Sequence, residues 1–225
     1  MRSAIIAAAL LLSASLVFSQ EEKIAFRTLA LAQTKFPELW AIEGGKPLAI
    51  TFSSAQPSAP FKADKASPLP IFKGPLDDKG MPKDTVPIKV AVPAASSILL
   101  IGWMEGEKPG FLAIADPFST MRSDDWLVIN PSKKDIAVQI GADTKPTAVK
   151  ANSHMAMKNT APSGTGAAVT IAAKQDDGKW KSVYTSFWPI YDNQRGMIVV
   201  IQKGEKLNVN YIADQITPPA PPPKP

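Results

Sequence analysis

The stretch RSDDWLVINPSKKDIAVQIG, residues 122–141, contains the features that decide the fold. Two short runs, WLVIN (126–130) and DIAVQIG (135–141), are rich in β-branched residues and are separated by a Pro-Ser-Lys-Lys turn. Short runs of this composition, bounded by turn residues, are typical of β-strands. The stretch therefore predicts a strand–turn–strand unit, with the acids Asp124 and Asp125 in the turn that starts its first strand.

The same pattern continues along most of the chain. No stretch sustains the i, i+3, i+4, i+7 apolar spacing of a helix for long, and residues 22–36, the best helix candidate, are interpreted as a strand. Simple alternation along 179–188 places Trp180 and Tyr184 on one face of a strand. The further predicted strands are 47–52, 86–92, 97–104, 110–116, 167–174, 179–188, 196–202 and 207–213.

These strands predict an all-β protein made of two tandem, small antiparallel β-sandwich units of the Ig-like type, or of one larger sandwich. We expect the first unit to cover residues 20–120 and the second unit to cover residues 121–214. The boundary lies in DPFSTMRSDD (116–125). Residues 72–87, which contain Pro, Gly and Asp without a regular period, are predicted to form a long loop.

An internal repeat is suggested at an offset of 88 residues, from position 39 to position 127. LWAIEGGKPLAITFS (39–53) then falls on LVINPSKKDIAVQIG (127–141) without a gap. Identities are few, so strand–turn–strand rhythm could also produce the match by chance. We interpret it as a duplication that made two similar units. Shorter matches join 61–64 to 149–152 and, with small gaps, 110–115 to 196–201.

The two ends of the chain differ from the rest. Residues 1–19, MRSAIIAAALLLSASLVFS, have the basic start, apolar segment and small final residues of a secretory signal peptide. The alternative, a membrane anchor, needs about 20 apolar residues, which is more than this run offers. Residues 215–225 are predicted to be a Pro-rich tail that does not pack. We therefore expect export to the periplasm, the cell surface or the medium, with no membrane span after removal of the signal.

Several classes of function are disfavoured by composition. The chain has no Cys, which excludes disulfides, thiol enzymes and Cys-zinc modules. His154 is its only His, too few for a His-rich metal site, and no Gly-x-Ser-x-Gly motif accompanies it. Only four of the 25 basic residues are Arg, which argues against nucleic acid despite the net charge of +5. We expect no catalytic residue, cofactor or metal.

Three Asp-Asp pairs, at 77–78, 124–125 and 176–177, all lie at predicted turns. Neighbours on a strand point to opposite faces, so such a pair is poorly placed to act on the two sides of a sugar. We interpret all three pairs as turn residues. Asp-Gly at 177–178 is in addition a strong hairpin signal.

The five Trp residues fall on or beside predicted strands, and we expect most of them in the cores. An exposed indole could instead stack on a sugar ring or a peptide. Trp126 and Trp188, together with Asp124 and Asp125, are therefore the speculative ligand-binding residues.

The strand–turn–strand halves, with VINPSKKDIAVQIG (128–141) and GMIVVIQ (196–202), resemble exported bacterial β-sandwich proteins of no assigned activity. The resemblance covers residues 24–213 in rhythm and implies no site residues. We expect a non-catalytic protein that binds or scaffolds an envelope protein or a polysaccharide. The alternative is a carbohydrate-binding or carbohydrate-modifying protein that uses loop acids and an exposed Trp.

Overall fold

The computed structural model describes residues 22–216, which form sixteen strands and no helix. The predicted all-β fold is thereby confirmed. Residues 22–36 contain a strand, as predicted, and no helix. The predicted signal peptide and residues 217–225 lie outside the described residues. The first eight strands are β1 (Lys23–Ala30), β2 (Leu39–Glu43), β3 (Lys46–Ile50), β4 (Phe61–Asp64), β5 (Leu69–Lys73), β6 (Ile88–Val90), β7 (Ser97–Glu105) and β8 (Lys108–Ala115).

The other eight strands follow a connection at residues 116–124. They are β9 (Asp125–Asn130), β10 (Ile136–Ile140), β11 (Thr147–Val149), β12 (Ser153–Lys158), β13 (Gly166–Lys174), β14 (Trp180–Pro189), β15 (Gln194–Lys203) and β16 (Lys206–Gln215). The last strand takes in Gln215, and the Ile216 amide donates to the Asn193 carbonyl at 2.8 Å. The second unit therefore continues to residue 216, two residues beyond its predicted end at residue 214.

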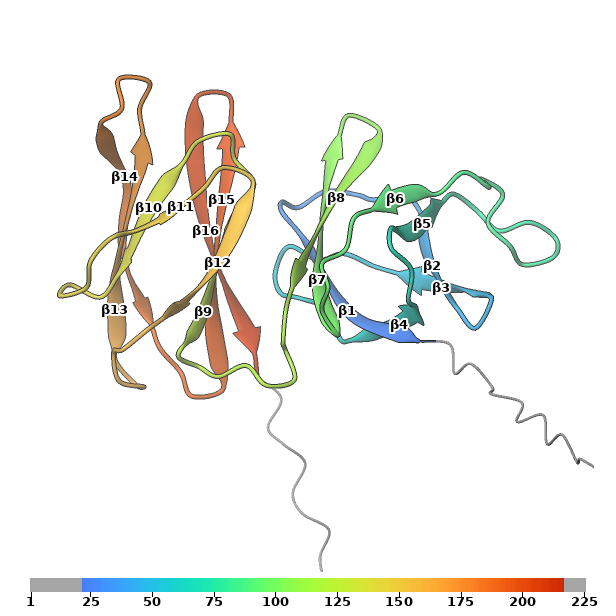
Figure 1. The fold of residues 1–225 in the computed structure, drawn as a ribbon, viewed down its shortest axis with the longest axis horizontal. Helices are drawn as coiled ribbons and strands as arrows, with labels where there is room; N and C mark the ends of the chain where they lie inside the picture. The colour runs from blue at the N-terminus through green and yellow to red at the C-terminus, as the bar shows by residue number, and fades with distance from the viewer. Residues whose placement is uncertain (1–21, 217–225) are drawn as a thin grey trace, which may run out of the picture.

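The strands form four sheets of four strands each, which stand side by side as successive layers in Figure 1. The first unit contains the sheets β3-β2-β5-β6 and β4-β1-β7-β8. The second unit contains β11-β10-β13-β14, which repeats the order of β3-β2-β5-β6, and β12-β9-β15-β16, which repeats the order of β4-β1-β7-β8. Each unit also has one parallel pair, β1 with β7 and β9 with β15.

This repeated topology corrects the register of the predicted repeat. An offset of 88 residues lays β2 on β9, whereas the strand that occupies the position of β2 in the second unit is β10. The shorter matches are displaced in the same way, since 110–115 belongs to β8 and 196–201 to β15. Apolar strand–turn–strand segments resemble their neighbours as well as their counterparts, which explains the displaced match. Duplication itself stays a prediction.

Three apolar cores hold the layers together. One lies within each unit, where its two sheets face each other. The third, called here the middle core, lies between the units, where the sheet of β1 and β7 faces the sheet of β9 and β15. Its fully or nearly buried members are Leu29, Leu31, Leu99, Ile101 and Ile114 from the first unit, and Leu127, Ile129, Met197, Val199 and Ile212 from the second.

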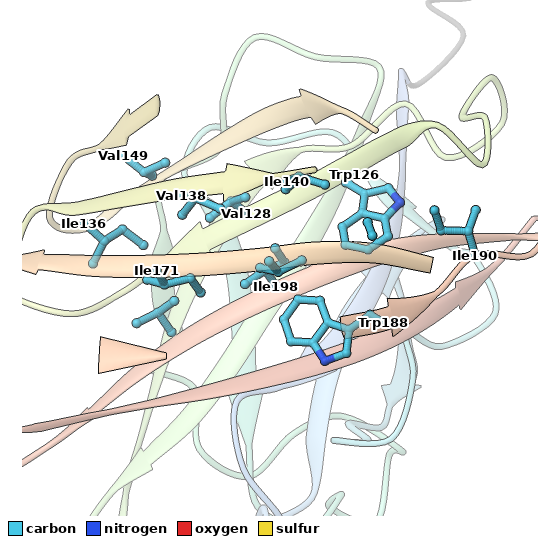
Figure 2. Packing of buried hydrophobic residues seen from close by; sticks show 13 residues of the cluster. Trp126, Val128, Ile136, Val138, Ile140, Val149, Ile171, Trp188, Ile190 and Ile198 are labelled. Atoms are coloured by element: carbon cyan, nitrogen blue, oxygen red, sulfur yellow. The ribbon is translucent and has the colours of Figure 1, made fainter. Parts of the chain in front are cut away.

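Trp126 and Trp188 belong to the core of the second unit, and Figure 2 shows both rings among its labelled side chains. Their ring centroids lie 6.1 Å apart, and both rings also contact Tyr211. Trp126 lies flat against Gly196 of β15, where an added Cβ would come within 2.5 Å of the indole. Gly196 therefore permits a close approach of ring and strand that a larger residue would block.

A β-bulge in β14 overturns the simple alternation expected there. The register with β13 shifts between Ile171 and Ala172, which leaves Val183 as an extra residue. Tyr184 pairs with buried Ile171 and faces the core, whereas Trp180 pairs with exposed Lys174 and faces outward. Trp180 and Tyr184 therefore lie on opposite faces, because one inserted residue reverses the phase of every later side chain.

Candidate functional site

Four of the six exposed large apolar side chains of the described chain lie on or just beyond β14, the last strand of an outer sheet. The strand is ten residues long, and only Trp188 in it is buried. Trp180 is 46% exposed, Val183 37% and Phe187 68%. Tyr191, just beyond the strand, is 50% exposed. β14 thus presents a free edge and a row of large apolar side chains at the same place.

The outward face beside Phe187 carries small, uncharged side chains. Phe187 covers Gly166 of β13, where an added Cβ would lie 2.1 Å from the phenyl ring. The next outward residues of β13 are Ala168, Thr170 and Ala172. Small side chains of this kind leave room for a flat partner beside the aromatic rings.

The other sheet edges have features that oppose pairing. The edge strands β3, β4, β6 and β11 have five residues or fewer. β8 begins with Lys108 and Pro109, and β12 ends with Lys158. β16 is as long as β14, but it carries Lys206 and two exposed Asn residues. β14 stands apart from these edges by combining length with exposed apolar residues.

The structure places the predicted ligand residues Trp126 and Trp188 in the core, with exposures of 1% and 7%. Neither offers an indole face to a ligand, because the ring stacking described above occupies both of them. Both rings pack in a core, as expected for most of the Trp residues, and this burial disfavours their use as a ligand platform. Trp180, in the same strand as Trp188, is the exposed indole.

Asp124 and Asp125 form a small surface ion cluster. Asp124 lies in the turn before β9, as predicted, whereas Asp125 is already the first residue of the strand. Lys158 Nζ lies 3.1 Å from Asp124 Oδ2 and 2.5 Å from Asp125 Oδ1, and Arg122 Nε lies 3.2 Å from Asp124 Oδ1. The hydrogen bond from Lys158 lowers the pKa of Asp124 below its ordinary value, against the opposing effect of desolvation.

We expect Lys158→Ala to raise the pKa of Asp124 toward its ordinary value, because the variant removes the donor that stabilises the carboxylate. NMR titration of the Asp side-chain carbons would measure the change. The pKa of Asp135 should stay the same, because the Ala151 amide and Lys150 lower it and Lys158 does not contribute. An unchanged pKa of Asp124 would contradict the role assigned to the hydrogen bond from Lys158.

The turn interpretation holds for the other Asp pairs too. Asp77 Oδ1 accepts hydrogen bonds from the amides of Lys79 and Met81. Gly178 has φ 79°, which the turn closing β13 and β14 requires, and the Gln175 amide donates to the Lys179 carbonyl. The carboxylates of Asp77 and Asp177 accept hydrogen bonds from backbone amides of their own turns.

A hollow of about 340 Å³ beside β9 and β12 brings Asp125, Trp126 and His154 together. Partial burial lowers the pKa of His154, which favours the neutral imidazole. Met155 and Met157, on the other face of β12, pack against the core of the second unit. The hollow ends at a buried group of charges that the sequence did not lead us to expect.

This group consists of two Arg and two Asp residues at one end of the middle core. Arg27 of β1 donates from Nη1 and Nη2 to Asp214 of β16, at 2.7 and 2.8 Å, and from Nη2 to Asp116, at 2.8 Å. Arg195 of β15 donates to the same carboxylates, at 2.9 and 2.6 Å. All four side chains are at most 6% exposed. The four charges cancel, and we call them the ion network.

The ion network joins the units, since Arg27 belongs to the first unit and Arg195 and Asp214 to the second. Burial acts to lower the pKa of Arg27, but its hydrogen bond to Asp214 and the two carboxylate charges outweigh this, so the pKa is raised. Arg27 also lies over the ring of Phe118, 4.9 Å from its centroid. The sequence feature that could have indicated the ion network is a single Arg within an apolar run, as in AFRTLALA (25–32).

In comparisons with known proteins, no family model matches the chain and no curated protein is found to be similar to it. Within residues 22–216, no three His, Asp or Glu side chains gather in an arrangement suited to a metal ion. The same residues contain no helix of the length and apolarity needed to cross a membrane.

Proposed function

We propose that this protein is a non-catalytic binding module whose β14 edge captures an extended segment of another protein of the cell envelope or the secreted fraction. The observation that carries the proposal is the combination found on β14: a free ten-residue edge with exposed Trp180, Val183 and Phe187. A strand at the edge of a sheet presents unpaired N–H and C=O groups that an added strand can bind.

The expected partner segment follows from the side chains of β14. Between Trp180 and Pro189 the only charged residue is Lys181, so a segment rich in charge would gain little there. Apolar residues at alternate positions of the segment would pack beside Val183 and Phe187 on the outward face. The segment is thus an uncharged, extended peptide with β-branched or aromatic residues at every second position.

The rest of the molecule supports such a role by holding the edge rigidly. The sheet of β14 packs on the second unit's core, and the middle core and the ion network fix that unit to the first. A preorganised edge binds an extended segment without an ordering cost of its own.

The test is a display library of ten-residue peptides selected against the purified chain. We expect selected peptides to slow amide hydrogen exchange in β14, because strand addition pairs its free amides. Phe187→Lys should weaken these peptides about tenfold, since it removes an apolar contact and adds a charge at the edge. Calorimetric titration would give the affinities.

Ala148→Lys is the matched control, because Ala148 is exposed on β11 at the opposite edge of the same sheet. This variant should bind the selected peptides as well as the unmodified chain does. Peptides that protect some other surface, or that bind Phe187→Lys unchanged, would show that β14 is not the binding edge.

A carbohydrate-binding role keeps one supporting observation, the exposed indole of Trp180 beside the turn that holds Asp176 and Asp177. A panel of soluble glycans, titrated against Trp fluorescence, would test it. A response lost in Trp180→Ala would favour the glycan, and no response would leave strand addition as the better proposal.

A further inference from the structure

A groove of about 840 Å³ opens between the two units at the end of the middle core remote from the ion network. Its walls come from the ends of β7 and β8 on one side and from the ends of β9 and β15 on the other. Leu31, Trp103, Leu112 and Ile201 belong to the middle core or pack against it, and all four also line the groove. The groove is thus the place where the middle core is left open.

The volume and the position suit a small ligand. Ligand sites commonly have volumes of about 300 to 1,000 Å³ and lie at domain interfaces. Trp103, Phe111 and Leu112 are half-buried here, so a ligand would cover apolar surface that now contacts water. Such burial favours a ligand with a hydrocarbon body.

The charges at the rim differ between the two sides. On the second unit, Lys133 and Lys203 line the groove, and neither has a carboxylate within 4 Å among residues 22–216. Their neighbour Lys134 is by contrast paired with Glu205 at 3.5 Å. On the first unit, Glu105 accepts a hydrogen bond from Trp103 Nε1 at 2.9 Å. The second unit's side of the groove thus has two lysine charges without a nearby carboxylate. The first unit's side has one carboxylate, which already accepts a hydrogen bond.

From this arrangement we infer that the groove binds a long-chain carboxylate, with its hydrocarbon chain on Trp103, Leu112 and Ile201 and its head group at Lys133 and Lys203. The chain replaces water along the open end of the middle core, and the head group supplies the negative charge that the two lysines lack. This site is separate from the β14 edge and does not depend on the function proposed for that edge.

Dodecanoate, kept below its micelle concentration, is the probe for the intact chain. We expect one molecule to bind per chain in calorimetric titration and to change the fluorescence of Trp103, a change that Trp103→Phe should abolish. Replacing both Lys133 and Lys203 by Ala should weaken binding about tenfold, because the head group loses two charge-assisted contacts.

Matched controls separate this site from general adhesion of a fatty chain. Lys46→Ala with Lys89→Ala, two exposed lysines on the outer sheet of the first unit, should leave dodecanoate binding unchanged. Dodecyltrimethylammonium and dodecyl maltoside, which carry cationic and neutral heads, should bind more weakly than dodecanoate.

Equal binding of all three amphiphiles, binding that does not respond to the loss of Lys133 and Lys203, or no binding of dodecanoate would overturn the inference. The β14 variant Phe187→Lys should bind dodecanoate normally. This variant therefore distinguishes a failure of the inferred groove site from a failure of the proposed β14 binding edge.

Discussion

Asp214→Asn should lower the free energy of unfolding by about 3 to 5 kcal/mol, the usual loss when one partner is removed from a buried ion pair. The amide keeps the volume of the carboxylate but leaves Arg27 and Arg195 buried with one counter-charge, Asp116, where two are now present. Arg27 Nε already has no hydrogen-bond partner, so the network has no spare acceptor to compensate. Urea denaturation followed by circular dichroism would measure the loss.

Asp177→Asn provides the matched control, because Asp177 is half exposed and pairs with Lys179 at 3.5 Å on the surface. Its free energy of unfolding should stay within about 0.5 kcal/mol of the unmodified chain. A loss below 1 kcal/mol for Asp214→Asn would mean that water or local movement neutralises the two Arg residues, contrary to the buried network described here.

Trp126→Ala is the second change with a large expected effect, a loss of about 3 to 5 kcal/mol in the free energy of unfolding. The indole is 1% exposed, lies against Gly196 and stacks with Trp188 and Tyr211. Its removal leaves a cavity that these neighbours can fill only in part. Denaturant unfolding and loss of near-ultraviolet circular dichroism would record the change.

Trp180→Ala is the control for the size of the side chain, because Trp180 is 46% exposed on the outward face of β14. We expect its effect on the free energy of unfolding to be below about 1 kcal/mol. Equal losses for the two variants would contradict the different roles given to the two indoles, one in the core and one on the surface.

Much of this fold follows from local sequence. Strands such as β7, β13 and β15 are short β-branched runs between turn residues, and local pattern is enough to recognise them. The bulge at Val183 is a different case, because one unpaired residue reverses the facing of a strand without changing its composition. The displaced register of the predicted repeat, with residue 39 on residue 127, has a similar cause. Local sequence rhythm does not distinguish one apolar strand from the next.

The ion network and the groove depend on contacts between distant residues, and this is why the sequence did not predict them. Arg27 and Asp214 lie 187 positions apart, and each looks like an isolated charge in its own strand. The groove likewise needs Trp103 and Lys203 from different units. The turn beside Asp124 and Asp125 was predictable, because it closes locally through the Asp125 amide, which donates to the Arg122 carbonyl.

The middle core also has a consequence for how the molecule comes apart. A chain cut within residues 116–124 would expose the apolar faces of β7 and β15 on separate pieces, and it would part Arg27 from its carboxylate on β16. Each half would then be prone to self-association, as large exposed apolar patches are. Heating should melt the two sandwiches in a single calorimetric transition, because neither half keeps its surface covered once the other has unfolded.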